Sequence, residues 1–131
     1  METLNVEIVS PSGQLVTNKK VTGLTVPALD GELNILPGHI DMVCLLGKGV
    51  LKLEDNSSYV IYKGFMEIAS GFNIVIAAEK AILVSELNKQ QVLNSIKEVE
   101  DRLLKESLDD ASFNELYESY QDHLAELRAF N

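Results

Sequence analysis

The chain has 131 residues, of which 46% are hydrophobic; this suffices for one domain of ordinary size, or a small domain with an appendage, and excludes a multidomain enzyme. Its 20 acidic residues outnumber its 11 lysines and arginines, and the resulting net charge of −9 disfavours a nucleic-acid partner or an anionic lipid surface. No apolar run approaches the roughly 20 residues of a membrane span, so direct membrane insertion is not expected.

The distribution of Gly, Pro and β-branched residues divides the chain near Leu87. All eight glycines lie between Gly13 and Gly71, and all three prolines lie between Pro11 and Pro37. Val, Ile and Thr together number 22 in residues 1–87 but only three from residue 88 onward. These residues favour strands and turns, whereas long segments without them favour helices. The division predicts a β domain in residues 1–87 and a helical domain in residues 88–131.

The predicted strands of the first domain begin with Leu4, Val6 and Ile8, which alternate with polar residues and so direct one face into a core. Turn signals lie at residues 10–13, 29–32 and 55–58. Further strands are predicted at residues 15–16, 21–26, 42–46, 49–53, 59–62, 65–69, 73–77 and 81–87. Because strands at intervals of about 8–12 residues are typical of a sandwich or barrel, we expect a β-sandwich of about ten short strands.

Residues 88–131 are expected to form an antiparallel two-helix hairpin. Asn88 is a suitable N-cap, and Gln91 stands three residues later, in the position of a capping-box partner. Each predicted helix has one apolar stripe, which must face the other stripe, the sandwich or a partner. The stripes are Val92, Ile96, Val99 and Leu103 on the first helix, and Phe113, Leu116, Tyr117, Tyr120, Leu124 and Leu127 on the second.

The second predicted helix also carries an acidic face, made of Glu115, Glu118, Asp122 and Glu126. At about 100° per residue these acids lie within a sector of roughly 80° opposite the apolar stripe. Glu118–Asp122 and Asp122–Glu126 are like-charge pairs four residues apart, and such pairs slightly destabilise an isolated helix. The simplest interpretation of this pattern is a solvated helix face.

A search for catalytic or ligand-binding chemistry is largely negative. The chain has two histidines, His39 and His123, and one cysteine, Cys44. Their spacing does not suggest a metal site, and a single cysteine cannot form an internal disulfide. We expect Cys44 to be a buried, inert thiol. We expect His39, which follows a Pro-Gly turn, to have a structural role. No nucleophile, phosphate-loop or metalloprotease motif is present, so we expect no catalytic residues, metal or cofactor.

One segment carries a resemblance to a known family. The run Gly31-Glu32-Leu33-x-Ile35-Leu36-Pro37-Gly38-His39 resembles the signature of the epsilon subunits of F-type ATP synthases. Val6-x-Ile8-Val9-Ser10-Pro11 precedes the run, and Leu46-x-x-Gly49, Lys63-Gly64-Phe65-x-x-Ile68 and Asn73-x-Val75-Ile76 follow it in the family's order. Together with the C-terminal helical hairpin, the resemblance covers essentially the whole chain.

The resemblance implies a non-catalytic rotor subunit in the central stalk of an ion-translocating ATP synthase. Its sandwich would bind the gamma subunit and the c-ring, and so would couple rotation to ATP synthesis. Its hairpin would regulate ATP hydrolysis through the alpha and beta subunits. The implied location is peripheral, on the cytoplasmic face of a bacterial inner membrane or the stromal face of a thylakoid. The implied c-ring-facing loop contains Asp30, Gly31, Glu32, Pro37, Gly38, His39 and Asp41.

The sequence departs from the family pattern in the hairpin. The family's second helix uses basic residues to meet an acidic segment of the beta subunit, whereas this helix is acidic. Some bacterial members bind ATP through a motif of Ile or Leu, Asp, two free positions, Arg and Ala. This chain has Asn88, Gln91 and Val92 where that motif has Asp, Arg and Ala, so the guanidinium that would pair with a phosphate is missing. We therefore expect weak inhibition and weak ATP sensing.

A different class of function is also compatible with the sequence. A free-standing β-sandwich could act as a binding module, with the helical hairpin as a dimerisation arm. The sandwich sequence argues against a small-molecule site, because it has no Trp, few aromatic residues and no convergent polar cluster.

Overall fold

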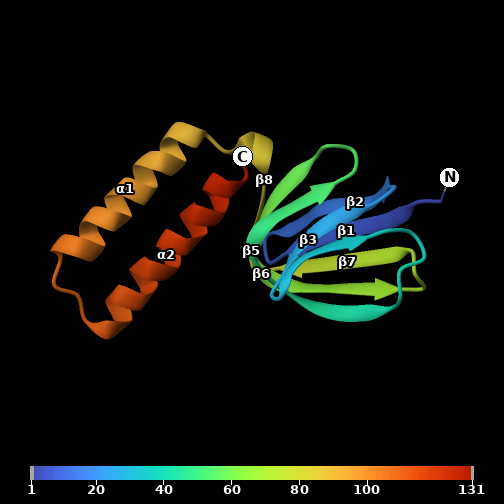
Figure 1. The fold of residues 1–131 in the computed structure, drawn as a ribbon, viewed down its shortest axis with the longest axis horizontal. Coiled ribbons are helices and arrows are strands. Elements are labelled where there is room, and N and C mark those ends of the chain that lie inside the picture. The colour runs from blue at the N-terminus through green and yellow to red at the C-terminus, as the bar shows by residue number, and fades with distance from the viewer. Residues whose placement is uncertain (1, 131) are drawn as a thin grey trace.

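The computed structural model describes residues 2–130 and confirms the predicted fold class, a β-sandwich followed by two helices (Figure 1). The strands are β1 (Leu4–Ser10), β2 (Gly13–Val21), β3 (Leu24–Ala28), β4 (Gly31–Ile35), β5 (Met42–Leu53), β6 (Ser58–Ala69), β7 (Asn73–Ala78) and β8 (Ala81–Leu83). A 3₁₀ turn, η1 (Val84–Glu86), leads to the helices α1 (Lys89–Lys105) and α2 (Asp110–Arg128).

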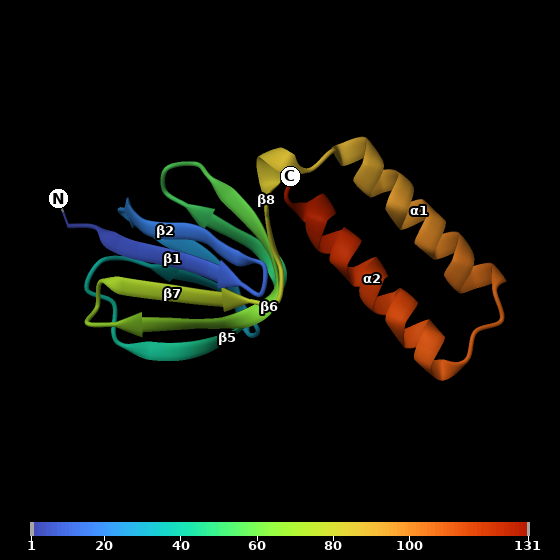
Figure 2. The ribbon, with the colours of Figure 1, turned by 180° about the vertical axis from the view of Figure 1, so that it is seen from behind.

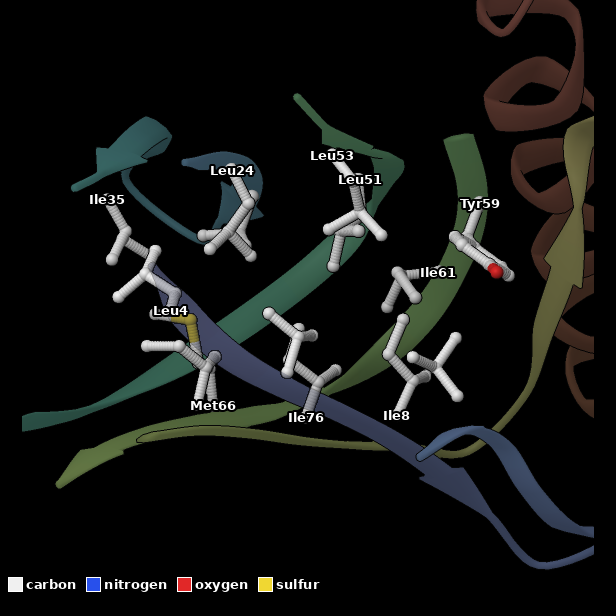
Figure 3. Packing of buried hydrophobic residues seen from close by; sticks show 14 of the residues in the cluster. Leu4, Ile8, Leu24, Ile35, Leu51, Leu53, Tyr59, Ile61, Met66 and Ile76 are labelled. Carbon is white, nitrogen blue, oxygen red and sulfur yellow. The ribbon is translucent and has the colours of Figure 1, made fainter. Parts of the chain in front are cut away.

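All strands belong to one hydrogen-bonded path that is folded over a single core. The order is β2-β1-β7-β6-β5-β3-β4, with β8 paired to β6. β1 and β7 run parallel, and the other pairs run antiparallel. In Figure 3, Leu24, Leu51 and Ile61 of one layer face Leu4, Met66 and Ile76 of the other. These side chains are essentially inaccessible to water, so the apolar contact between the layers stabilises the sandwich.

The structure differs from the sequence-based strands in four ways, and it has eight strands where about ten were expected. Predicted strand 21–26 is divided between the end of β2 and the start of β3, and predicted strand 81–87 is a strand only over β8, because residues 84–86 form η1. Predicted strands 42–46 and 49–53 form one strand of 12 residues, β5, and predicted strands 59–62 and 65–69 form β6. The glycines at 47, 49 and 64 did not end these strands, because β5 and β6 pair in the same register on both sides of the one position that the ladder skips, Gly47 opposite Lys63. β4 occupies a segment predicted to be a turn and a loop, and its pairing with β3 supplies the hydrogen bonds.

Gly64 lies where β6 changes partners. Residues 59–61 pair with β8, whereas residues 64–69 pair with β7. Lys63 and Gly64 both have positive φ, +82° and +157°. A Cβ on Gly64 would lie 2.1 Å from the carbonyl oxygen of Ala77, so no other residue fits without moving β7. This close approach of the two backbones allows β6 to pass from one layer of the sandwich to the other.

Side-chain caps set both helix starts. The Asn88 side chain accepts a hydrogen bond from the Gln91 backbone nitrogen at 3.1 Å, and Asp109 accepts one from Ser112 at 2.8 Å. These caps satisfy backbone donors that have no partner within the helix. The two helices run antiparallel, and α2 lies nearer the sandwich than α1 does (Figures 1 and 2).

Replacement of Gly64 tests the strand crossover. Gly64→Ala should lower the free energy of unfolding by about 4 kcal/mol or more, because backbone strain adds to a steric clash. Gly13→Ala is a matched control, since Gly13 has φ +128° with open space around its missing Cβ, and should cost about 1–3 kcal/mol from strain alone. Urea unfolding measures both, and equal losses would show that the contact with Ala77 is unimportant.

Candidate functional site

A groove lies between the sandwich and α2. Its volume is about 1040 Å³. The sandwich contributes Pro11, Leu29, Leu45 and Phe65 to its walls, and α2 contributes Leu124. Leu29 and Leu45 are each 63% exposed and Phe65 is 47% exposed, so this wall presents large apolar side chains to water. An exposed apolar surface of this kind is typical of a site that binds another protein, a ligand or a membrane.

The apolar wall follows from the sequence of β5. Met42, Cys44 and Leu46 alternate with Val43 and Leu45 along its first half. The first set is buried or packs against the core, and the second set points outward, with Val43 65% exposed. Leu45 pairs directly with Phe65 of β6, which extends the outward surface onto the next strand. A strand that is apolar on both faces is normally covered on both sides by other parts of the protein. Here the core covers the inward face of β5, and the outward side chains Val43 and Leu45 remain exposed.

The predicted loop from Asp30 to Asp41 is not a single loop, because β4 divides it. Asp30, Gly31 and Glu32 lie at the turn between β3 and β4 and are exposed. Gly31 and Glu32 also border a small second hollow, which Arg128 of α2 lines as well. The two ends of β4 are about 13 Å apart at a rise of about 3.3 Å per residue. The second part of the predicted loop therefore lies at the other end of this strand.

The second part of that loop is joined to the turn between β6 and β7. Gly38 donates a backbone hydrogen bond to the carbonyl of Gly71 at 2.8 Å, and the Asp41 carboxylate accepts one from the Gly71 nitrogen at 2.8 Å. Nδ1 of His39 lies 2.9 Å from the carbonyl oxygen of Ile40. Pro37 is half-buried and precedes Gly38, which has φ +85°. These contacts give the second part of the loop a structural role.

An ionic cluster joins β5 and β6 to α2. Lys48 Nζ lies 2.6 Å from Asp122 Oδ1 and 3.0 Å from Glu118 Oε1, and it donates a 3.3 Å hydrogen bond to the Glu118 carbonyl. Lys63 Nζ lies 3.0 Å from the same Glu118 oxygen. Burial of Lys48 lowers its pKa, but hydrogen bonds to Asp122 and Glu118 outweigh burial, so the pKa lies above its usual value. Hydrogen bonds from Lys48 and then Lys63 hold the pKa of Glu118 below its usual value.

A second polar contact lies further along α2, in buried surroundings. Glu126 is 6% exposed, and its carboxylate accepts a hydrogen bond from the hydroxyl of Tyr62 on β6. Nδ1 of His123 lies 2.9 Å from the other Glu126 oxygen. Burial and the Glu126 charge raise the pKa of Tyr62 well above its usual value. Tyr62 therefore remains a neutral donor at any physiological pH.

The acidic face of the sequence analysis is thus largely not a solvated face. Glu118, Asp122 and Glu126 contact lysines or Tyr62 of the sandwich, and only Glu115 of the four is without a contact to it among the described residues. The periodicity correctly grouped these side chains, but it could not reveal that the sandwich places two lysines opposite them. Lys48 and Lys63 were missed for this reason: each stands beside a glycine, and the sequence marks neither as a binding residue.

The apolar stripes are buried to different extents. Val92, Ile96 and Val99 of α1 are buried, and Leu103, Leu116, Tyr120, Leu124 and Leu127 are half-buried. Phe113 and Tyr117 are 43% and 44% exposed and stack on each other, with ring centroids 6.1 Å apart. The fully buried apolar residue of α2 is instead Ala125, which packs with Val60 and Tyr62 of β6.

Two remaining sequence expectations concern Cys44 and ligand sites. Cys44 is half-buried and packs against the core, and burial followed by the charge of Asp30 raises the pKa of its thiol. Residues 2–130 contain no group of three His, Cys, Asp or Glu side chains that could hold a metal ion. Neither described helix is both long and apolar enough to cross a membrane.

Comparisons with known proteins agree with the resemblance. The family model "ATP synthase, Delta/Epsilon chain, beta-sandwich domain" matches residues 3–84. The ATP synthase epsilon chain of Campylobacter concisus is 31% identical over 117 residues, which span 86% of this chain and 89% of that protein. The ATP synthase epsilon chain of a Jannaschia species is 36% identical over 105 residues, 78% of each chain.

Two solved structures share the fold. A chain of the Euglena gracilis mitochondrial ATP synthase matches with a TM-score of 0.85 and 19% identity, over 98% of this chain and 82% of that one. A chain from the central stalk and c-ring of the Tetrahymena thermophila mitochondrial ATP synthase matches with a TM-score of 0.64 and 14% identity, over 99% and 98%. At these identities the likeness establishes the fold.

Removal of one hydroxyl tests the buried contact between β6 and α2. Tyr62→Phe should lower the free energy of unfolding by about 1–3 kcal/mol, because the buried Glu126 carboxylate loses a donor. Tyr59→Phe, at another buried tyrosine of the same strand, is the control and should cost less than about 1 kcal/mol. Thermal and urea unfolding measure the difference, and equal effects in the two variants would contradict a stabilising role for the Tyr62–Glu126 hydrogen bond.

Proposed function

The chain belongs to the Delta/Epsilon chain family of ATP synthases, and on that premise we propose that it is a non-catalytic rotor subunit that couples c-ring rotation, through the gamma subunit, to ATP synthesis. The observation that carries the proposal is the exposed apolar wall of the groove. Leu45 and Phe65 lie side by side on paired strands and remain 63% and 47% exposed. A rotor subunit needs such a surface, because it transmits torque to another subunit only through a stable interface.

We assign the groove wall to the gamma subunit. A stable interface has a central cluster of large apolar side chains surrounded by polar groups. Leu29, Leu45 and Phe65 supply the cluster here, and Lys63 and Glu79 at the groove edge supply polar groups. The wall stands on paired strands, so it enters the complex already ordered and loses little entropy on binding.

We assign the acidic turn between β3 and β4 to the c-ring. Only two residues, Leu29 and Asp30, separate the paired Ala28 and Gly31, so the turn is short and well defined. Asp30 and Glu32 stand exposed on either side of Gly31. By contrast, Pro37, Gly38, His39 and Asp41 lie at the other end of β4, where Gly38 and Asp41 bind Gly71 in the β6–β7 turn. A peripheral position at the membrane surface follows from contact with the ring.

We further propose that residues 1–87 are the coupling domain and residues 88–131 a regulatory domain that inhibits ATP hydrolysis weakly. The main core cluster lies entirely within the sandwich, so the first domain does not need the hairpin for its core. The acids of α2 are engaged by Lys48 and Lys63, and an acidic helix is repelled by an acidic partner. Weak ATP sensing is consistent with Asn88 acting as a helix cap.

Loss of the apolar wall should prevent assembly. The double variant Leu45→Ser/Phe65→Ser should bind the purified gamma subunit at least about 100-fold more weakly, because each residue would be a central anchor. Leu104→Ser is the matched control: Leu104 is 84% exposed but lies on α1, and this variant should bind gamma normally. Calorimetry and co-purification with a tagged chain measure the effect. Retention of gamma by the double variant, or failure of the unaltered chain to retain gamma, would refute the proposal.

Removal of the hairpin tests regulation. In the assembled catalytic complex, a chain ending at residue 87 should change the ATP hydrolysis rate by less than about twofold, because an acidic α2 does not bind an acidic partner surface. The measurement is steady-state hydrolysis with the full and shortened chains, after retention of gamma by both has been checked. A several-fold rise on truncation that disappears at high salt would show that the hairpin inhibits through charged contacts after all.

A further inference from the structure

Helix α2 has a third face besides the two that meet the sandwich and α1. Its acids Glu118 and Asp122 meet the sandwich, and its Tyr120 donates a 2.9 Å hydrogen bond to Glu100 of α1. At about 100° per residue, a further set of side chains lies within a sector of roughly 80° that contains neither Glu118 nor Asp122. This set, the open stripe, consists of Asp110, Phe113, Tyr117, Gln121, Leu124 and Arg128.

The open stripe has different surroundings along its length. Its C-terminal half lines the groove, through Gln121, Leu124 and Arg128. Its N-terminal half, from Asp110 to Tyr117, extends toward the tip of the hairpin, which points away from the sandwich in both views (Figures 1 and 2). Phe113 and Tyr117 there are 43% and 44% exposed, and their rings stack with planes 9° apart. The outer half of the stripe is therefore an ordered aromatic surface that water reaches.

The two ends of the open stripe carry opposite charges. Asp110 is the first residue of α2 and Arg128 is the last, and the stripe has no charged residue between them. No salt bridge within residues 2–130 involves either side chain. The helix between them is about 27 Å long, so the two cannot pair within one chain. With an acid at one end, a base at the other and uncharged side chains between them, the stripe is complementary to a reversed copy of itself.

We propose that the open stripe is a homodimer interface, in which the α2 helices of two copies pack antiparallel about a two-fold axis at the level of Ser119. Such an isologous contact sets each residue against one that lies equally far from the axis on the other copy. Asp110 of each copy then faces Arg128 of the other, so the interface contains two of these salt bridges. The start of each helix also meets the end of the other, where the helix dipoles attract.

The same arrangement places the aromatic pair at the groove. Phe113 and Leu124 lie at nearly equal distances from the axis, so Phe113 of one copy enters the groove beside Leu124 of the other. There it meets the exposed side chains of Leu45 and Phe65. Aromatic side chains are enriched in interfaces, because they bury a large apolar area with few rotatable bonds. One contact thus removes two exposed apolar surfaces from water, the groove wall and the aromatic pair.

The charge of the chain limits the strength of this dimer. Each copy has a net charge of −9, so two copies repel each other. On α2 itself, however, Glu118 and Asp122 are already paired with Lys48 and Lys63. At physiological salt, charges further than about 8 Å apart are largely screened, so the pairs within the interface decide the balance. We expect a reversible dimer with a dissociation constant of about 10–100 µM.

The dimer is a form of the chain outside the rotor complex. It covers the groove wall that we assign to the gamma subunit, so a gamma subunit and a second copy exclude each other. The inference does not rest on that assignment, because the experiment uses the full-length chain without any other protein.

Charge reversal tests the pairing of Asp110 with Arg128. Sedimentation equilibrium in about 0.15 M KCl, with the full-length chain at about 5–200 µM, should show a monomer–dimer equilibrium. Asp110→Arg brings two arginines together and Arg128→Asp brings two aspartates together, so each variant alone should self-associate at least about tenfold more weakly. An equimolar mixture of the two variants should form heterodimers about as tightly as the parent forms homodimers, because every such pair is again an arginine with an aspartate.

Replacement of the aromatic anchor tests the groove contact. Phe113→Ser should weaken self-association at least about tenfold. Leu104→Ser and Asp101→Arg, at exposed residues of α1, are the matched controls and should self-associate as the parent does. Circular dichroism checks that every variant keeps its helices.

Three results would overturn the proposal. The first is a parent chain that stays monomeric at about 200 µM, which would leave gamma as the occupant of the groove. The second is a mixture of Asp110→Arg and Arg128→Asp that associates no more tightly than the two variants alone. The third is parent-like association of Phe113→Ser, which would place any dimer contact on another surface.

Discussion

The pairing of β5 with β6 is the contact on which the rest of this molecule depends. Both strands have 12 residues and run antiparallel along almost their whole length, so each contributes to both layers of the sandwich. Their inward side chains, including Leu51, Ile61 and Met66, fill the core. Their outward side chains form the apolar wall of the groove, and Lys48 and Lys63 of the same pair hold the hairpin. The pair thus joins the core, the apolar wall of the groove and the helices.

This arrangement explains why an acidic helix can dock on an acidic protein. The net charge of −9 would favour separation of the parts if the charges were evenly spread. They are not, because two lysines meet at the edge of the sandwich that α2 approaches. Local pairing at 2.6–3.0 Å outweighs repulsion from distant acids, which salt and water screen. The same dependence on screening makes the contact sensitive to the solvent in a way that the apolar core is not.

The accuracy of the sequence-based interpretation depended on the range of the interactions involved. The helix start at Asn88 was predicted because a cap acts over three residues. The α1 stripe was predicted because Val92, Ile96 and Val99 share one helix face whatever they pack against. The strand at Gly31–Ile35 was missed because its hydrogen bonds come from β3, and no local pattern distinguishes it from a loop. For the same reason, the residues from Asp30 to Asp41 were predicted to form one loop, although the two parts of that loop lie at opposite ends of β4.

The sequence by itself determined the two-part architecture, the family and the grouping of acids on one side of the last helix. These follow from composition, periodicity and local motifs, which act within a few residues. Only the tertiary structure decided that this acidic side faces Lys48 and Tyr62, that Leu45 and Phe65 share an exposed wall, and that Gly64 must be glycine. Each of these depends on residues 13 to 74 positions apart in the chain. Such contacts are fixed by how the sheet folds over its core, and that information does not lie in any one segment.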